Sequence, residues 1–176
     1  MTDWNAIVHE YGPVVWQTAY RLLNHEADAA DCFQRTFLAA VELAATCPVR
    51  SWPGMLKRIA TARALEQLRN RYRPAARVEC LPDSPLADRL APGPSDLAEA
   101  KELAVALRAA LAEIDPAQAE TFCLVCLEGL SYADAATALG VTVTHAGVLL
   151  SRGRAALRDR LRAFDPSNQH LPGGHP

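Results

Sequence analysis

Apolar residues along most of the chain recur three or four positions apart, which is the spacing of one face of an α-helix. Three such series occupy residues 4–22, 30–44 and 56–72, and Pro48 stops the second of them. No convincing alternation of apolar and polar residues, the pattern of a half-buried strand, interrupts these series. They predict three helices that close a first domain of residues 1–73.

A change in proline content follows the third series. Five prolines fall between positions 74 and 94, where little apolar periodicity is present. This composition is typical of a partly extended linker, which we place at residues 74–95. Helical spacing resumes in residues 96–164 and predicts a second small all-α domain. The tail of residues 165–176, with Pro, Gly and His, is expected to be disordered.

Helix boundary signals divide the second domain. Asp115 precedes a proline, and Ser131 and Thr142 each precede an apolar series, so all three are expected to cap helix N-termini. Gly140 is expected to end the helix that Ser131 begins, because a left-handed residue costs glycine little. For the last helix we expect a buried face made of Val143, Ala146, Leu150, Leu157, Leu161 and Phe164.

The distribution of charge along the chain is more informative about binding partners than the net charge is. Half of the 176 residues are hydrophobic, enough for a packed core, and the net charge is only −2. Of the 18 basic residues, however, seven lie in residues 57–77 and five more in residues 152–162. Two basic blocks in a nearly neutral chain indicate two contacts with an anionic partner. With no apolar run long enough to span a membrane and no secretory signal, we expect a cytoplasmic protein.

The cysteines give little sign of chemistry. Their odd number, five, argues against a complete disulfide framework. Cys123 and Cys126 form a CxxC, but both lie on an apolar stripe, so we expect both to pack in the core. A thiol redox enzyme is the alternative, and it would require these two thiols for function. No Ser/His/Asp arrangement, phosphate loop or pair of catalytic carboxylates is evident, so we expect neither an enzyme nor a cofactor or metal.

Residues 131–154, SYADAATALGVTVTHAGVLLSRGR, have the order of a helix-turn-helix, with small residues and one glycine where the two helices meet. A structural helical hairpin is the alternative. No Lys or Arg occurs from Ser131 to Ser151, so the reading helix lacks the bidentate guanine contact that is the commonest specific one. Arg152, Arg154 and Arg158 follow it and are expected to contact phosphates.

Three stretches of the chain resemble the bacterial RNA polymerase sigma factors of the extracytoplasmic-function group, in the sigma-70 family. The first is AYRLLNHEADAADCFQRTFLAAV, which contains Asp31, Gln34 and Phe37 in an Asp-x-x-Gln-x-x-Phe pattern. The second is SWPGMLKRIATARALEQLR, and the third is IDPAQAETFCLVCLEGLSYADAATALGVTVTHAGVLLSRGRAALR. Since these stretches follow one another in order across a proline-rich linker, the resemblance covers nearly the whole chain.

This resemblance implies partners and contact residues. The first domain would dock on core RNA polymerase through Asp31, Gln34 and Arg35. It would recognise and melt the −10 promoter element through Arg50, Trp52, Lys57, Arg58, Arg63, Arg69 and Arg71. The second domain would place its last helix in the −35 major groove through Thr142, Thr144, His145, Val148, Ser151 and Arg152. An anti-sigma factor is a further implied partner, whereas no membrane and no small-molecule substrate is implied.

Some residues depart from the family pattern. Arg35 stands where an acid is usual, Thr61 and Ala62 replace Arg-Asn, and Gly147 and Leu149 occupy positions that are often basic. Weak −35 recognition suits a module that polymerase holds in place better than a free dimeric helix-turn-helix regulator. The same departures also suit a diverged regulator that binds polymerase or an anti-sigma protein without reading promoters.

Overall fold

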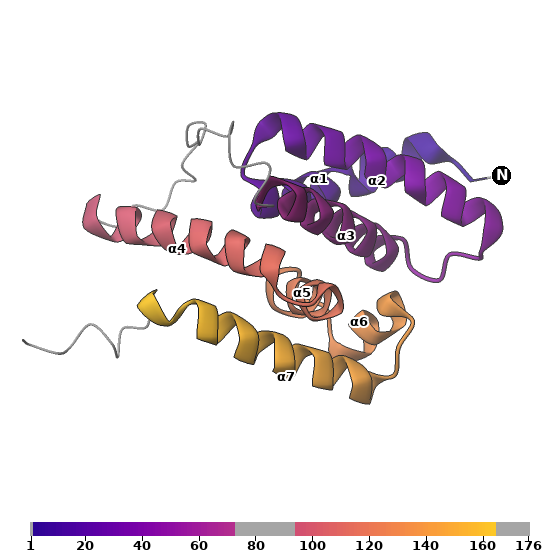
Figure 1. Cartoon of the computed structure of the whole chain (residues 1–176). Coiled ribbons are helices and arrows are strands. Elements are labelled where there is room, and N and C mark those ends of the chain that lie inside the picture. The colour runs from indigo at the N-terminus through magenta and orange to yellow at the C-terminus, as the bar shows by residue number, and fades with distance from the viewer. Residues whose placement is uncertain (1, 73–93, 165–176) are drawn as a thin grey trace, which may run out of the picture.

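A computed structural model describes residues 2–72 and 94–164, and all regular structure within these two ranges is helical (Figure 1). The expected all-α fold is therefore confirmed. Nearly all of the predicted linker, residues 74–95, and the whole predicted tail, residues 165–176, lie outside the described residues. We call α1–α3 the N-terminal half and the helices from residue 94 onward the C-terminal half.

The N-terminal half consists of α1 (Trp4–Leu23), α2 (Glu26–Thr46) and α3 (Trp52–Tyr72), which confirms the three helices expected from apolar spacing. Asp3 caps α1 by accepting a hydrogen bond from the backbone N–H of the third residue after it, at 3.1 Å. Asn24 ends the same helix with φ at 48°, a left-handed conformation that asparagine tolerates better than most residues.

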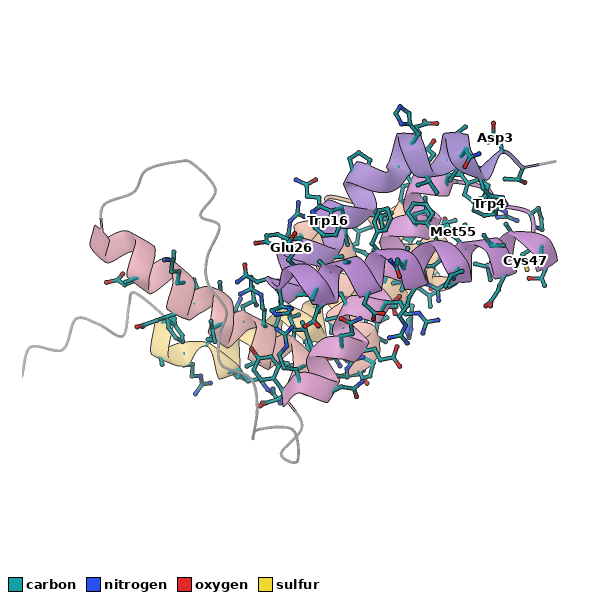
Figure 2. The ribbon with its side chains drawn as sticks, turned by 90° about the horizontal axis from the view of Figure 1, so that it is seen from above. Asp3, Trp4, Trp16, Glu26, Cys47 and Met55 are labelled. Carbon is teal, nitrogen blue, oxygen red and sulfur yellow. The ribbon has the colours of Figure 1, made fainter. Side chains whose placement is uncertain are left out.

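Two clusters of buried side chains hold this half together. One lies between the start of α1, the second half of α2 and the start of α3, and Trp4 and Trp52 pack edge to face across it with ring centres 5.4 Å apart. Figure 2 shows Trp4 at the end of these helices where Cys47 lies, with Trp16 toward the other end. The second cluster continues into the C-terminal half. It contains Ala19, Leu22, Leu23, Ala29, Cys32, Ala64, Leu65, Leu68, Ala110, Leu111, Ile114, Ala119, Cys123 and Leu157.

The C-terminal half is a series of shorter helices after one long one. Its elements are α4 (Pro94–Glu113), α5 (Pro116–Phe122), the π-helix η2 (Cys123–Leu127), α6 (Tyr132–Leu139), α7 (Val143–Arg160) and the 3-10 turn η3 (Arg162–Phe164). The central helix of the molecule is α3, which contacts α1 and α2 on one side and α4, α5, η2 and α6 on the other (Figure 1). The two halves are therefore packed against each other along α3.

All four predicted helix boundaries in the C-terminal half are confirmed. The Asp115 carboxylate accepts hydrogen bonds from the backbone N–H groups of Ala117 and Gln118, at 3.0 and 3.2 Å. Ser131 and Thr142 each accept one from the amide three residues on, at 3.1 and 3.2 Å. Gly140 ends α6 with φ at 69°, the left-handed conformation that favours glycine.

Two burial predictions in this half are wrong. Val143 is 52% exposed, because it is the first residue of α7 and precedes the turn that packs on α6. Ala146, Leu150 and Leu157 are buried as expected, whereas Leu161 and Phe164 are only half-buried. Cys126 is exposed although Cys123 is buried. The reason is the π-helix: the backbone N–H of Glu128 bonds the carbonyl five residues earlier, and this wider turn rotates Cys126 off the apolar stripe.

Candidate nucleic-acid interface

The helices α6 and α7 form the predicted helix-turn-helix. They meet at 99°, within the range typical of this motif, and Ala135, Ala136 and Ala146 are buried where they touch. Within the described ranges no single helix is long and apolar enough to cross a membrane, although this bent pair would pass by length and composition if taken together. The residues predicted to read DNA are all exposed on this motif, namely Thr142, Thr144, His145, Val148, Ser151 and Arg152.

The three predicted polymerase contacts lie exposed on one face of α2. The carboxylate of Asp31 accepts a hydrogen bond from the Gln67 side chain at 2.9 Å and lies 3.6 Å from the Arg35 guanidinium, while Gln34 lies beside them on the same face. Arg35, which reverses the usual charge of the family pattern, is thus partly neutralised by an acid one turn earlier. Leu38, one turn further along α2, is 65% exposed and adds an apolar surface to this face.

The basic block on α3 is divided between several local environments. Arg63 pairs with Glu66 of the same helix at 3.3 Å. Arg71 binds both the carbonyl of Leu23 and the carboxylate of Asp28, so it ties α3 to the turn between α1 and α2. These contacts lie within the N-terminal half and give the side chains a structural role beside the predicted DNA contact.

Arg69 and the residues of the loop before α3 lie in other environments. Two nitrogens of the Arg69 guanidinium are buried without a hydrogen-bond partner among the described residues. Arg50 is exposed in the loop, and Trp52 is half-buried against Trp4. With Lys57 and Arg58, Arg50 lines a cavity of about 500 Å³ between this loop and α6.

Lys57 and Arg58 face acids of the C-terminal half. The Arg58 guanidinium lies 3.4 Å from the carboxylate of Glu120 on α5, and burial raises the pKa of this carboxyl although Arg58 acts in the opposite direction. The Lys57 ammonium donates a hydrogen bond to the backbone carbonyl of Glu128 at 3.0 Å and lies 3.9 Å from the carboxylate of the same residue. Two cations predicted to contact DNA are therefore already paired within the chain.

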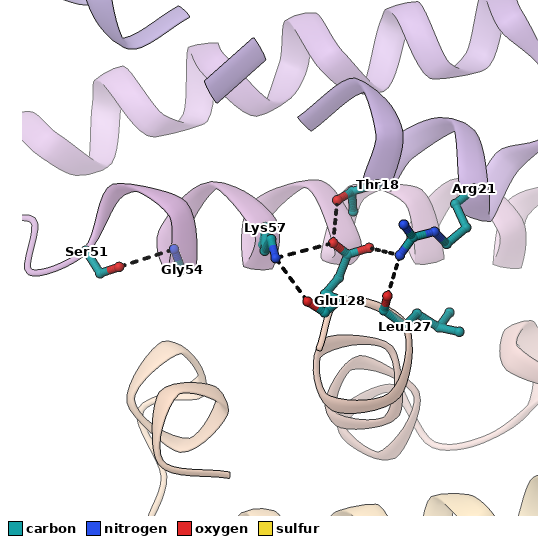
Figure 3. Close-up of polar contacts among 7 residues, drawn as sticks. All are labelled: Thr18, Arg21, Ser51, Gly54, Lys57, Leu127 and Glu128. Atoms are coloured by element: carbon teal, nitrogen blue, oxygen red, sulfur yellow. Dashed lines mark hydrogen bonds and ion pairs between the residues drawn. The ribbon is translucent and has the colours of Figure 1, made fainter. Parts of the chain in front are cut away.

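Glu128 is the most enclosed acid in this region, with 5% of its side chain exposed (Figure 3). Its carboxylate accepts hydrogen bonds from the Thr18 hydroxyl at 2.8 Å and from the Arg21 guanidinium at 3.1 Å. Arg21 also donates to the carbonyl of Leu127, and Lys57 approaches from α3. Every one of these side-chain partners comes from the N-terminal half, whereas Glu128 belongs to the C-terminal half.

Several residues that join the two halves were missed by sequence reasoning, Glu120 among them. Besides Thr18, Arg21 and Glu128, the side chain of Arg108 on α4 donates to the carbonyls of Leu22 and Arg21 at the end of α1, at 2.9 and 3.3 Å. Burial lowers the pKa of Arg108. The one available signal was a basic block without enough acids of its own, which indicates an anionic partner but does not say that the partner is in the same chain.

Comparison with known proteins matches each half of the chain to a family description. The family description "Sigma-70 region 2" matches residues 7–73, and "Sigma-70, region 4" matches residues 104–157. The extracytoplasmic-function RNA polymerase sigma factor SigE of Mycolicibacterium smegmatis is 32% identical over 165 residues, which are 92% of this chain and 62% of that protein. The chain thus spans somewhat less than two thirds of the length of this curated relative.

Two solved structures share the fold. The sigma factor RpoE, in complex with the anti-sigma factor NepR from Bartonella quintana, is 23% identical with a TM-score of 0.54, over 92% of this chain and 98% of that one. CnrH, in complex with the cytosolic domain of CnrY, is 26% identical with the same TM-score of 0.54, over 90% and 87% of the two chains. The chain belongs to the sigma-70 family, in its extracytoplasmic-function group.

Proposed function

We propose that this protein is a sigma factor that binds core RNA polymerase and directs it to promoters by recognising −10 and −35 elements. The observation that carries the proposal is the exposed row along the start of α7, from Thr142 to Arg152, on a helix-turn-helix with a 99° crossing. A protein of this kind catalyses no reaction itself, because the chemistry belongs to polymerase. Polymerase and promoter DNA would place it in the bacterial cytoplasm.

The two halves would have separate tasks. Residues 1–73 would dock on polymerase through the α2 face of Asp31, Gln34 and Arg35, and would engage the −10 element through α3 and the loop before it. Residues 96–164 would hold the −35 element through α7, with the row from Thr142 as the reading surface. The absence of Lys and Arg from Thr142 to Ser151 predicts weak discrimination there, since each good bidentate contact to a base is worth about 1–3 kcal/mol.

The testing experiment is reconstitution with core RNA polymerase from the source organism. Retention of the chain on polymerase at moderate salt, and run-off transcripts that start at defined sites on genomic DNA, are the expected results. Gln34→Ala should reduce retention, whereas His145→Ala, on the exposed α7 row, should reduce start-site selection and leave retention unchanged. Retention without any promoter-dependent transcript would contradict the proposal.

A second candidate function is a diverged regulator that binds polymerase or an anti-sigma protein without reading promoters. Thr61 favours it, because a fully buried threonine stands here where the family pattern has an arginine. Both solved relatives were captured with a protein partner, which supports an anti-sigma factor as a partner of this chain. The run-off transcripts separate the two candidates, since only a sigma factor produces them.

A further inference from the structure

The contact at Glu128 joins parts of the chain that are far apart in sequence. Its carboxylate is held by Thr18, Arg21 and Lys57, which lie 110, 107 and 71 residues away. A carboxylate that is this enclosed must keep its partners, because a buried charge that loses one is strongly destabilised. The contact therefore ties the end of the C-terminal half formed by η2 and α6 to α1 and α3.

The same contact involves Lys57, a cation that is predicted to contact DNA in the proposed function. Lys57 lies on α3 beside the loop expected to meet the −10 element, yet its ammonium is bound to the carbonyl of Glu128 and only 23% of its side chain is exposed. A carboxylate and a DNA phosphate attract an ammonium in the same way. Lys57 thus cannot serve both partners at once, and η2 packs against the helix that carries it.

We propose that Glu128 is an intramolecular latch, which holds the η2–α6 end of the C-terminal half on α3 and keeps Lys57 from DNA in the free chain. Binding of DNA by α3 then requires this end to lift. The inference rests on the proposed function in taking α3 as a DNA-binding helix. It goes beyond that function because control of promoter binding is built into the chain, with no second protein needed to cover α3.

Glu120, the other acid facing α3, does not carry the latch. Among the described residues Arg58, at 3.4 Å, is the one cation that pairs with its carboxylate, and one of its oxygens is buried without a hydrogen bond. Glu128 differs in having a hydroxyl, a guanidinium and an ammonium around one carboxylate. The latch is also selective, because the reading row of α7 stays exposed while Lys57 is covered.

Two native thiols allow the latch to be tested directly in the full-length chain. Cys126 lies in η2 and Cys47 lies at the end of α2, and both are exposed, whereas Cys32 and Cys123 are buried. In a Cys80→Ser background, spin labels on the two exposed thiols report the distance between η2 and the loop before α3. A single narrow distance is expected for this background, and a broader or longer distribution is expected for Glu128→Gln.

DNA binding is measured on the same free proteins by fluorescence anisotropy with a random-sequence single-stranded 30-mer. If the latch opens, the Glu128→Gln protein should bind the DNA on the order of tenfold more tightly than the parent. Apparent affinity rises with the fraction of molecules in the binding-competent state. The matched control is Glu113→Gln, which removes the same charge from an exposed pair with Arg160 inside the C-terminal half. It should leave the spin-label distance unchanged and binding within about twofold of the parent.

Arg21→Gln is the decisive second variant, and it keeps the test valid if Glu128→Gln folds poorly. It removes a positive charge, so electrostatics alone predicts weaker DNA binding, whereas the latch predicts tighter binding. An unchanged distance in both latch variants, or a longer distance without tighter binding, would overturn the proposal. Retention on core polymerase, measured separately, shows whether the proposed function itself fails.

Discussion

Gly153 shows at the scale of one residue how closely the helices of the C-terminal half approach. It is buried on α7, and a Cβ placed there would lie 3.0 Å from the backbone carbonyl oxygen of Gln118 on α5. Backbone cannot move away as a flexible side chain can. Glycine is therefore required at this crossing because of a close approach rather than an unusual backbone angle.

We expect Gly153→Ala to destabilise the protein by about 1–3 kcal/mol, the usual cost of overpacking, in urea unfolding followed by circular dichroism. Gly147→Ala on the same helix is the control. A Cβ at Gly147 meets its nearest atom, on the Tyr132 ring, at 4.0 Å, so the gain in helix propensity should stabilise the protein by about 1 kcal/mol. Equal effects of the two substitutions would show that α5 and α7 do not pack this closely.

Thiol reactivity is a second property of single residues. Burial raises the pKa of the Cys32 thiol to about 11, and burial also raises the pKa of Cys123. At pH 8 both remain protonated and inaccessible, whereas Cys47 and Cys126 are exposed. In the Cys80→Ser protein we expect two thiols to react quickly with Ellman's reagent and two more only after unfolding. Fast reaction of all four in the folded protein would contradict the burial of Cys32 and Cys123.

At the scale of one element, the π-helix η2 decides which side chains meet the N-terminal half. Regular α-helical spacing would place Cys126 on the buried stripe with Cys123. The wider turn instead directs Cys126 to the surface, where its sulfur lies 3.3 Å from Arg154, and ends at Glu128 with the backbone bonded to Cys123. Apolar spacing alone could not indicate this change, because every residue from 123 to 127 is apolar and fits either helix.

Helix caps, in contrast, are local, and the sequence indicates them well. The Ser131 hydroxyl satisfies the amide of Asp134 at the start of α6, so Ser131→Ala should cost about 1 kcal/mol in thermal or urea unfolding. Ser151→Ala, at an exposed position in the middle of α7, is the control and should change stability by less than about 0.5 kcal/mol. A loss no larger than that of the control would mean that water caps α6 as well as Ser131 does.

At the scale of the whole molecule, the two halves share a buried cluster. Leu111 of α4 is 1% exposed and belongs to the same cluster as Leu65 and Leu68 of α3. Apolar contact of this kind is absent from a chain whose domains are joined only by a linker. The halves are therefore expected to unfold as one cooperative unit in the free protein.

Leu111→Ala tests this coupling. Deleting a buried leucine side chain typically costs 2–5 kcal/mol, on the order of a third of a small domain's stability. All three tryptophans lie in the N-terminal half, so their fluorescence should report a loss caused by Leu111 in the other half. We expect fluorescence and circular dichroism midpoints to fall together. Leu103→Ala, on the same helix at a 41% exposed site, should leave both unchanged. An unmoved fluorescence midpoint for Leu111→Ala would show that the halves unfold separately.

The sequence by itself determined the features that depend on near neighbours. Apolar spacing predicted the helices, and Asp115, Ser131, Gly140 and Thr142 marked their ends, because capping involves atoms only two to four residues apart. The order of the helix-turn-helix followed from the same local patterns, whereas the residues of its reading row came from the family resemblance. Family resemblance supplied the expected partners.

Only the tertiary structure decided what lies opposite the basic block on α3. The basic residues of α3 indicated an anionic partner, and from the sequence we predicted that this partner is DNA. In the folded protein Glu128 and Glu120 of the same chain face Lys57 and Arg58. Glu128 is 71 residues from Lys57, and its position depends on a π-helix and on packing across two halves. Attraction between charges has no preferred sequence separation, so only the folded chain shows which anion the cations hold.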